Sequence, residues 1–462
     1  MKNFLPICLL ALLGSYVIES CTPEEQLFTE NSALKLRFSQ DTVLFDTIFT
    51  TIGSTTKRFQ VYNDDRNALN ISSIRTVNPS SPYKLTVNGV TGNQFEDLRL
   101  LGNDSMLILV EVLIDPLDED LPFIIEDEVA FETNSNIQSL KLVAWGQDAN
   151  FLSDSILNCN TIWTSNRPYV IFNSVLIDSL CQLTIEPGTR IYSHVGSYIY
   201  VKGTIDIRGS SDNRVLLTND RLDANFRDAP GQWEGIFFLE GSKDNRIIYT
   251  DIRNANYGIW LGTPDTDTIP DLQLAQVRIE NMARSGLVAF TSDLRAENLL
   301  INNCAEYCIG NFAGGSYSYN HCTFTNISSD FFRQNPVMAV TDNLLLTDQS
   351  LLAEDIYLEL INSIVWGDFS DELLLNNEGG RRFSLLVASD IIKTSEGNLD
   401  TNGNLINQDP LFINPDGNDY TLDSLSPAID AGLNTGILFD LDGILRDSLP
   451  DIGAFEWIPG ND

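Results

Sequence analysis

Ile248-Tyr-Thr-Asp-Ile-Arg-Asn254 is the first copy of a pattern that returns three times, in Ala275-Gln-Val-Arg-Ile-Glu-Asn281, Asn298-Leu-Leu-Ile-Asn-Asn303 and His321-Cys-Thr-Phe-Thr-Asn326. In each copy apolar residues alternate with polar ones, and each copy ends on an asparagine. These asparagines follow one another at intervals of 27, 22 and 23 residues. A period of about 20 to 30 residues that is built from strands is typical of a solenoid.

One copy is too short to bury its apolar side chains alone, so successive copies must stack and share a core. We therefore predict an all-β protein in which residues 152–400 form a right-handed parallel β-helix, the pectin-lyase-like solenoid. Asparagine suits the turn because it tolerates the left-handed conformation and can hydrogen bond to the asparagine of the next coil. A leucine-rich repeat is the rival fold, but the L-x-x-L-x-L spacing and helix-forming runs are absent.

Strand alternation predicts which polar residues this β-helix shows to solvent. With Ile205, Ile252 and Ile279 inward, the outward candidates for catalysis are Asp206, Arg208, Asp251, Arg253 and Glu280. A calcium-assisted lyase needs three or more carboxylates that converge on one ion, with an arginine or lysine base. Here single acids are interleaved with arginines, which favours a ladder of surface ion pairs over catalysis.

Two further groups of residues are candidates for binding. The aromatic residues that could stack on sugars are Tyr198, Tyr200, Trp260, Tyr317 and Tyr319. Asp440 and Asp442, just before Gly443, are a weak calcium site, and we expect no other cofactor. Arg446 falls within that loop, which favours a salt bridge from Arg446 to Asp440 or Asp451.

The N-terminal residues indicate where in the cell the protein is located. An apolar run from Phe4 to Val17 is too short for a permanent membrane helix, and it is followed by Ile18-Glu-Ser-Cys21. The segment resembles a lipoprotein signal peptide over residues 1–20, which implies that a lipid is attached to Cys21. Thr22-Pro-Glu-Glu-Gln26 resembles the acidic tether that some Gram-negative lipoproteins carry as a signal for display on the outer face, and we expect residues 21–38 to form a tether. We therefore expect a lipid-anchored protein of the outer membrane that faces the cell exterior.

Residues 39–149 contain seven strand-like runs with the turn spacing of a β-sandwich. Val61-Tyr-Asn63, Asp115-Pro116, Phe131 to Asn134 and Ala144-Trp-Gly146 follow one another in the order that resembles the ASH or Hydin group of immunoglobulin-like domains. That resemblance implies a spacer or docking module without catalytic residues. In the solenoid itself, residues 218–230 form an inserted loop and a candidate contact surface.

From about residue 345 the chain resembles the choice-of-anchor Q domain, through Ile361-Asn-Ser-Ile-Val-Trp-Gly367, Asp409-Pro-Leu-Phe-Ile-Asn414 and Ser426-Pro-Ala-Ile-Asp-Ala-Gly432. The resemblance implies a bacterial surface β-helix protein and no particular reaction. We expect residues 401–462 to cap the open last coil, because its apolar interior would otherwise face water. The side chains expected beneath the cap are Phe412, Tyr420, Ile429, Ile452 and Phe455.

Charge and cysteine content narrow the partners. The chain has 64 acidic and 28 basic residues, a formal net charge of -36, which argues against nucleic acid as a partner. Beyond Cys8 and Cys21, five cysteines leave the disulfide pairing open: Cys159, Cys181, Cys304, Cys308 and Cys322. Cys304 and Cys322 lie near matching points of adjacent coils, where we expect a bridge or a buried stack.

The expected function is binding or adhesion at the cell surface, through contact with a polysaccharide or another surface. The alternative is an enzyme on the same scaffold, either a calcium-assisted polysaccharide lyase or a glycoside hydrolase. A solenoid carries its specificity in loops and side chains that have no general signature, so the sequence does not name the ligand.

Overall fold

The computed structural model describes residues 27–262, 269–327 and 331–460. The expected signal peptide and Cys21 lie outside the described residues. The chain divides into two compact units between Gln147 and Asp148. Within the described ranges the structure is all-β with one short 3-10 helix, η2 (Pro415–Gly417), so no helix there could cross a membrane.

The first unit contains two five-stranded sheets that share one hydrophobic core. One sheet has the order β1 (Arg37–Phe38), β3 (Lys57–Asn63), β8 (Asp104–Val112), β5 (Tyr83–Val87), β6 (Val90–Gly92). The other has the order β2 (Thr42–Phe49), β10 (Asn136–Gln147), β9 (Phe123–Thr133), β4 (Leu69–Thr76), β7 (Gln94–Leu100).

Alternating burial along these strands explains the two layers, since one face of each strand supplies the core and the other faces water. Phe59 and Val61 of β3 are buried, for example, while Gln60 between them is exposed. Leu36 is also buried, and its backbone N–H donates to Gln138 Oε1 at 2.9 Å. Residues 36–38, which we assigned to the tether, therefore belong to this unit.

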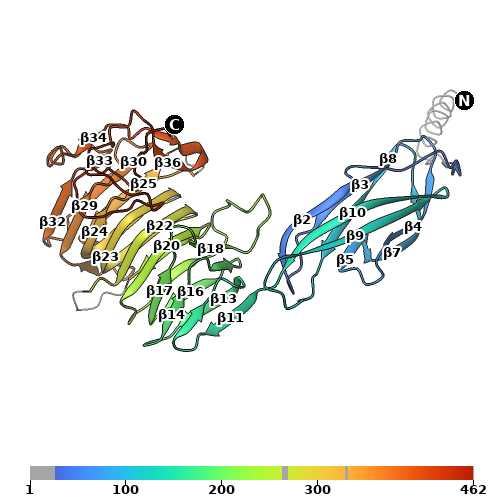
Figure 1. Cartoon of the computed structure of the whole chain (residues 1–462), viewed down its shortest axis with the longest axis horizontal. Helices are drawn as coiled ribbons and strands as arrows, with labels where there is room; N and C mark the ends of the chain where they lie inside the picture. The colour runs from blue at the N-terminus through green and yellow to red at the C-terminus, as the bar shows by residue number, and fades with distance from the viewer. Residues whose placement is uncertain (1–26, 263–268, 328–330, 461–462) are drawn as a thin grey trace, which may run out of the picture. The chain divides into compact units, whose positions relative to one another are not determined.

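The described part of the second unit is built around one 22-stranded sheet whose strand pairings are parallel (Figure 1). The four copies of the repeat lie in register. Ile252 pairs with Ile279, Ile279 with Ile301, and Ile301 with Phe324. All four side chains are fully buried, as the alternation predicts.

The pairings sort the strands into three parallel stacks, which close around the core. Stack 1 holds β12 (Thr161–Trp163), β14 (Gln182–Ile185), β17 (Thr204–Arg208), β29 (Ile356–Ile361) and β32 (Phe383–Ala388). Stack 2 holds β15 (Arg190–Ser193), β18 (Val215–Asn219), β25 (Thr323–Asn326), β30 (Ile364–Gly367), β33 (Ile391–Ile392) and β34 (Leu405–Ile406). Stack 3 holds β16 (Tyr198–Val201), β19 (Gly235–Phe238), β21 (Tyr257–Leu261), β26 (Met338–Thr341) and β31 (Leu373–Asn376).

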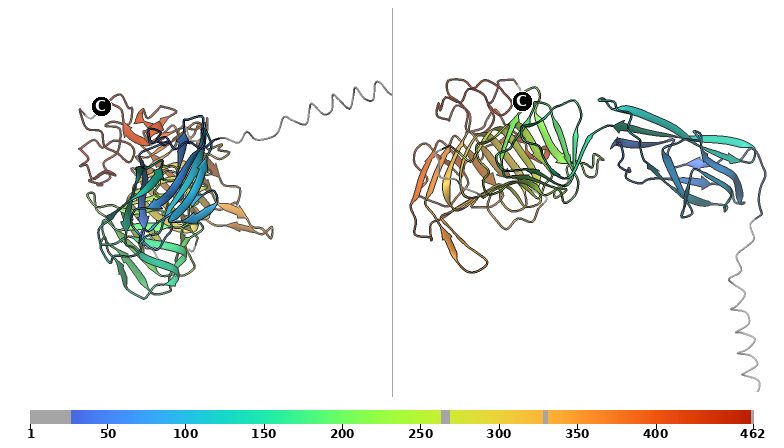
Figure 2. Two further views of the ribbon diagram at one scale, coloured as in Figure 1. Left: turned by 90° about the vertical axis from the view of Figure 1, so that its right-hand side faces the viewer. Right: turned by 90° about the horizontal axis from the view of Figure 1, so that it is seen from below.

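Longer strands bend from one stack into the next. They are β11 (Asn150–Ile156), β13 (Tyr169–Ile177), β20 (Asn245–Arg253), β22 (Leu272–Met282), β23 (Ser285–Cys304) and β24 (Ile309–Asn320). In β20 the bend is at Tyr249, whose φ is 43°, so residues 245–248 lie in stack 1 and residues 250–253 in stack 2. Beside the stacks, β27 (Asn343–Leu345) and β28 (Leu351–Ala353) form an antiparallel hairpin that projects as an orange arm (Figure 2).

The repeated asparagines occupy the corner that follows stack 2. Asn254, Asn281 and Asn303 have φ values of 64°, 62° and 51°, in the left-handed region. Asn281 donates to Asn254 Oδ1 at 3.3 Å, and Asn303 donates to Asn281 Oδ1 at 2.7 Å. The ladder of asparagine amides expected from the sequence is confirmed, except that Asn326 instead bonds to the backbone of Cys304.

After β34 the chain turns back along stack 2, and we call residues 407–457 the strap. It contains β35 (Phe412–Asn414) and β36 (Asp419–Leu422). Coil side chains bind its backbone at widely separated levels: Arg214 donates to Leu441 O at 3.3 Å, Asn298 to Phe439 O at 2.8 Å, and Asn362 to Leu433 O at 2.8 Å. We expected this segment to cover the open end of the last coil, but it lies along the side of stack 2 instead, so that expectation is wrong.

The strap lies on the side of the coils because stack 2 offers an apolar surface there. Leu300, Ile364 and Trp366 of the coils share two small cores with the strap. Of the side chains expected beneath the cap, Tyr420, Ile452 and Phe455 are buried, and Phe412 and Ile429 are half-buried.

Candidate functional site

The structure divides the candidate catalytic residues between two stacks. Asp206 and Arg208 lie in stack 1, where the Asp206 carboxylate accepts from Arg208 Nε at 2.6 Å and from Arg246 Nε at 3.0 Å. Asp251, Arg253 and Glu280 lie in stack 2. The bend at Tyr249 separates the two groups, so the expectation of one outward ladder is wrong.

Stack 2 carries a cluster of alternating charges. Arg214 Nε donates to Asp251 Oδ1 at 2.9 Å, and Arg278 Nη1 lies 3.8 Å from the same oxygen. Arg278 also pairs with Asp442 of the strap. Arg253 Nε lies 3.0 Å from Glu280 Oε2, without the alignment of a hydrogen bond. The cluster results from register, because Asp251 pairs with Arg278 and Arg253 with Glu280 along neighbouring strands.

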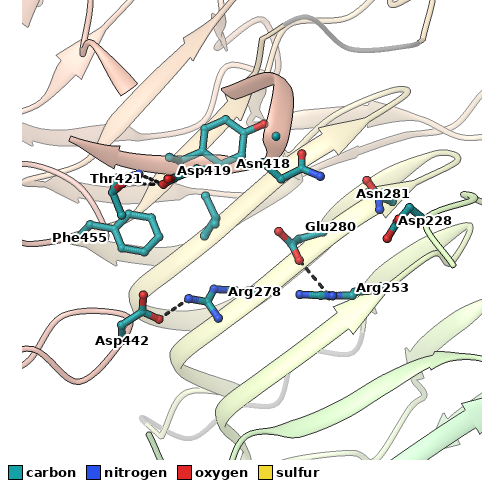
Figure 3. Close-up of a pocket in the computed structure, with 13 residues that line it drawn as sticks. Asp228, Arg253, Arg278, Glu280, Asn281, Asn418, Asp419, Thr421, Asp442 and Phe455 are labelled. Atoms are coloured by element: carbon teal, nitrogen blue, oxygen red, sulfur yellow. Dashed lines mark hydrogen bonds and ion pairs between the residues drawn. The ribbon is translucent and has the colours of Figure 1, made fainter. Parts of the chain in front are cut away.

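A cleft of about 420 Å³ opens at this cluster, between the strap and the coils, and we call it the strap cleft (Figure 3). Its floor is formed by coil residues: Arg253, Arg278, Glu280, Asn281 and Leu300. The strap supplies one wall with residues 417–421, Asp442 and Phe455. Asp228, from the inserted loop that the sequence marked as a contact surface, reaches the opposite side.

Glu280 is an acidic residue of the cleft whose surroundings raise its pKa. The residue is only 7% exposed. Burial raises the pKa of its carboxyl because the charged form loses hydration, and Arg253 opposes that shift. Glu280 is therefore protonated at a higher pH than an ordinary glutamate.

The weak metal candidate has a structural role instead. The Asp440 carboxylate is buried and accepts backbone N–H groups from Asp442 at 2.9 Å, Ile444 at 2.8 Å and Glu456 at 3.0 Å. The described residues contain no group of three or more histidine, cysteine or acidic side chains placed to hold a metal ion. We expected a salt bridge from Arg446 to Asp440 or Asp451, and that expectation is wrong: Arg446 Nη1 binds Glu456 Oε2 at 3.0 Å.

Three of the five aromatic candidates lie in stack 3 and are partly exposed: Tyr198, Tyr200 and Trp260. The structure adds rings that the sequence reading missed, so that one stripe crosses five coils, and we call it the aromatic stripe: Tyr198, Tyr200, Phe237, Tyr257, Trp260, Phe290 and Phe312. Consecutive ring centres along it are 5.0 to 5.8 Å apart, with Tyr200 and Phe237 at 6.1 Å. Phe237 pairs with Tyr200 on the neighbouring strand, and that pairing would have identified it. Nothing in the sequence indicates which residues of the two strands pair.

Tyr317 and Tyr319 do not belong to this surface, and their assignment to ligand binding is wrong. They are 1% and 0% exposed. Their strand pairs them with Leu294 and Ala296, whose side chains point inward, and the small Ala296 leaves room for a ring. Tyr317 donates its hydroxyl to Gly314 O at 2.9 Å, and Tyr319 donates to Asn311 Oδ1 at 3.0 Å.

Polar groups flank the aromatic stripe. Asn256 Nδ2 donates to Glu234 Oε2 at 2.9 Å, and Arg284 Nε donates to Glu306 Oε1 at 3.1 Å. The Arg284 guanidinium lies 5.2 Å from the centre of the Tyr257 ring. The stripe therefore combines apolar ring surface with hydrogen-bonding groups at its margin.

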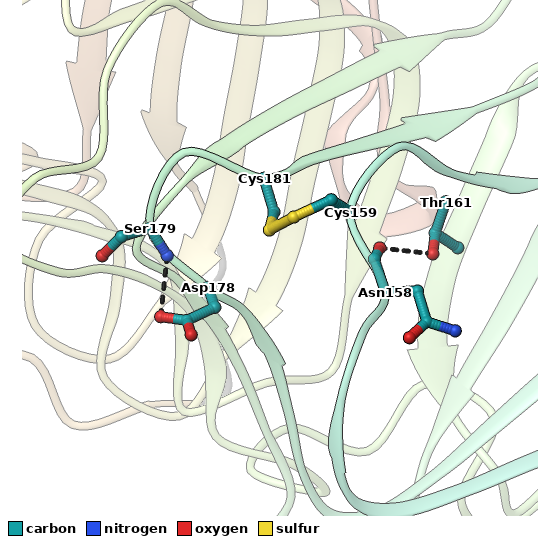
Figure 4. The surroundings of a disulfide bond; sticks show 6 residues. All are labelled: Asn158, Cys159, Thr161, Asp178, Ser179 and Cys181. Atoms are coloured by element: carbon teal, nitrogen blue, oxygen red, sulfur yellow. Dashed lines mark hydrogen bonds between the residues drawn. A yellow bond between two sulfur atoms is a disulfide. The ribbon is translucent and has the colours of Figure 1, made fainter.

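Among the residues that the structure describes, five cysteines divide into one bridge and three thiols. Cys159 and Cys181, 22 residues apart, form a disulfide between two successive coils (Figure 4). Cys304, Cys308 and Cys322 are free and buried. Burial raises the pKa of the Cys322 thiol to about 12. The three thiols serve as small apolar core residues.

No protein-family description and no curated protein matches the sequence. Similar solved structures include a protein of unknown function from Porphyromonas gingivalis W83, 14% identical over 27% of this chain and 59% of that one, with a TM-score of 0.19. The ASH/PapD-like domain 7 of human CEP192 is 9% identical over 28% of this chain and 94% of that domain, with a TM-score of 0.18. The E. coli chaperone DraB is 13% identical over 25% of this chain and 55% of its own, with a TM-score of 0.18. Scores this low carry no argument about function.

Proposed function

We propose that this protein is a glycan-binding protein of the bacterial cell surface, with a right-handed parallel β-helix that presents the aromatic stripe to an extended polysaccharide. A lipid on Cys21 holds the chain on the exterior of the outer membrane. The first unit serves as an immunoglobulin-type spacer, and the C-terminal region is of the choice-of-anchor Q type. The aromatic stripe is the observation that carries the proposal.

The parallel pairing of coils supports the β-helix. Strands of the second unit recur in three stacks, and four sequence repeats lie in register at Ile252, Ile279, Ile301 and Phe324. The disulfide between Cys159 and Cys181 supports export, because disulfides persist in oxidising compartments. The net charge of -36 suits an exposed, soluble surface and disfavours nucleic acid.

The stripe supports glycan binding through its shape and chemistry. Its rings follow one line across coils that are about 4.8 Å apart, so the surface is long and narrow like an extended sugar chain. Aromatic rings offer apolar contact to sugar C–H groups, and the flanking Glu234, Asn256 and Glu306 can bind hydroxyls. Rings that only filled the core would be buried, whereas the rings of the stripe stay partly exposed over five coils.

The test measures binding of purified protein to a panel of soluble polysaccharides by isothermal titration calorimetry. We expect Phe237→Ala and Trp260→Ala each to weaken binding of the best ligand by roughly tenfold, which is about 1.4 kcal/mol. The matched control is Tyr357→Ala, which removes an exposed ring from β29 in stack 1. Equal binding by all three variants would disprove the role of the stripe.

A further inference from the structure

The strap cleft is a concave surface that the aromatic stripe does not use. Its floor lies in stack 2, whereas the stripe lies in stack 3. Its volume of about 420 Å³ falls within the range of roughly 300 to 1,000 Å³ that is common for sites of small ligands. The cleft is also built from three parts of the chain: coil strands, the strap and the inserted loop.

The polar groups of the cleft include both donors and acceptors that lack partners. Neither terminal nitrogen of Arg253 has a hydrogen bond among the described residues, and the Arg253 side chain is 38% exposed. Glu280 holds Arg253 in place through Oε2, and its Oε1 has no hydrogen bond to the described part of the chain. Both groups point into the cleft in Figure 3.

The remaining lining residues combine neutral hydrogen-bonding side chains with an aromatic edge. Asn281, Asn418 and Thr421 contribute amides and a hydroxyl, and Tyr420 and Phe455 contribute rings. Sugar hydroxyls both donate and accept hydrogen bonds, so a site for them needs both kinds of partner beside an apolar surface.

The geometry points to the strap cleft as a second glycan site, which holds one or two neutral sugar units in an end-on position. Arg253 would donate to one hydroxyl and Glu280 would accept from its neighbour, beside the exposed edge of the Phe455 ring. The inference deepens the proposed function, because the stripe would bind the length of a glycan and the cleft its end.

The charge balance selects a neutral ligand over a charged one. Four acidic residues, Asp228, Glu280, Asp419 and Asp442, line the cleft with two arginines. Arg278 is already paired with Asp442, so a uronic acid would meet an excess of negative charge. A divalent cation is disfavoured too, because no three of these acids converge among the described residues.

The experiment titrates the whole purified protein with small sugars by calorimetry and by saturation-transfer NMR. The probes are glucose, galactose, mannose and N-acetylglucosamine, the disaccharides cellobiose, maltose and diacetylchitobiose, and glucuronic acid as the charged arm. We expect at least one neutral probe to bind, and Arg253→Gln and Glu280→Gln each to weaken that binding at least tenfold. Glu280→Gln keeps the side-chain volume, Arg253→Gln shortens the side chain but keeps an N–H donor, and thermal melting should show that both variants remain folded.

Several outcomes would overturn the inference. Binding of none of the neutral probes, binding of glucuronic acid alone, or unchanged binding by both variants would each do so. The Trp260→Ala variant separates this site from the stripe, since it should weaken polysaccharide binding and leave disaccharide binding intact. If Trp260→Ala loses polysaccharide binding and the parent protein binds no disaccharide, the cleft is not a glycan site. The proposed function of the aromatic stripe would still stand.

Discussion

At the scale of single residues, His321 shows how the strap is held in place. Its Nδ1 lies 3.1 Å from Asp451 O, and Asn362 Nδ2 lies 2.9 Å from its Nε2. The carbonyl can only accept, so Nδ1 carries the proton and Nε2 accepts from Asn362. Asn362 cannot turn its amide over freely, because the amide also donates to Leu433 O and accepts from Leu433 N–H, at 2.8 and 2.7 Å. The neutral ring therefore fits this network and the charged ring does not.

We predict that His321 makes stability fall in acid. Burial, with Arg446 adding to it, lowers the pKa of His321 to about 3, below its ordinary value of 6.5. A depressed pKa gives stability that is present above pH 6.5 and is lost as the pH falls toward 3, because the unfolded chain binds the proton first. The loss is on the order of 1.4 kcal/mol per pH unit between pH 6 and 4.

The measurement compares denaturant unfolding of the parent and His321→Asn between pH 7 and pH 4. Asp451 titrates in both proteins, and its pKa is raised to about 6. The folded chain therefore binds this proton more tightly than the unfolded chain, so protonation of Asp451 stabilises the fold as the pH falls. The difference between the two proteins cancels that contribution. We expect the variant to be less stable at pH 7 and the deficit to shrink in acid; a deficit that is constant with pH would refute this role of His321.

At the scale of elements, the asparagine corner joins one coil to the next. Asn281 is 4% exposed, adopts φ 62° and has amide bonds to both neighbouring coils. An alanine there would lose both hydrogen bonds and would be strained in the left-handed region.

We predict that Asn281→Ala lowers the free energy of unfolding by roughly 2 to 4 kcal/mol, from the lost bonds and the left-handed strain together. Asn281→Gly should recover about 1 kcal/mol of this, since glycine removes only the strain. Asn88→Ala is the control, because Asn88 has φ 49° in an exposed turn of the first unit. Equal losses at Asn88 and Asn281, by chemical unfolding, would show that the ladder adds nothing.

The strap is a second element whose attachment can be tested. The Arg446 side chain is 1% exposed, and besides Glu456 it donates to Asn298 Oδ1 at 2.9 Å and to Gly453 O at 3.0 Å. We predict that Arg446→Met costs about 3 to 5 kcal/mol, because Glu456 is left as a buried charge without its partner.

The double variant Arg446→Met with Glu456→Gln should recover part of that loss in urea unfolding. Arg37→Met is the matched control, since its ion pair with Asp64 at 2.7 Å is solvent-exposed and should be worth less than about 1 kcal/mol. A loss for Arg446→Met as small as for Arg37→Met would show that the strap does not depend on this ion pair.

At the scale of the whole molecule, the proposed lipid decides where the binding surfaces operate. A single acyl chain binds membranes weakly and reversibly, whereas two or more chains anchor a protein stably. We predict that Cys21→Ser moves the protein from the outer-membrane fraction to the soluble fraction. Immunoblots of fractionated cells measure this, with Cys304→Ser as a control for loss of a cysteine elsewhere. Retention of Cys21→Ser in the membrane would disprove the anchor.

The sequence predicted well which side chains of the repeated strands are buried, and predicted the outer surface less well. Ile252, Ile279 and Ile301 were assigned correctly because burial follows the local alternation of apolar residues. Tyr317 and Tyr319 were misplaced because the chain bends at Ala313, where φ is 64°, and resets which side chains face inward. A periodic sequence pattern does not show where a single corner changes which side chains face inward.

The sequence by itself determined the all-β class, the spacing of the repeated strands and the asparagine at the corner, because each of these depends on residues within one repeat. Only the tertiary structure decided that Asp206 lies apart from Glu280, that Phe237 and Trp260 belong to one stripe, and that the strap runs along stack 2. Those features join residues that are tens to hundreds of positions apart. Their contacts depend on the register of distant strands, which local spacing does not encode.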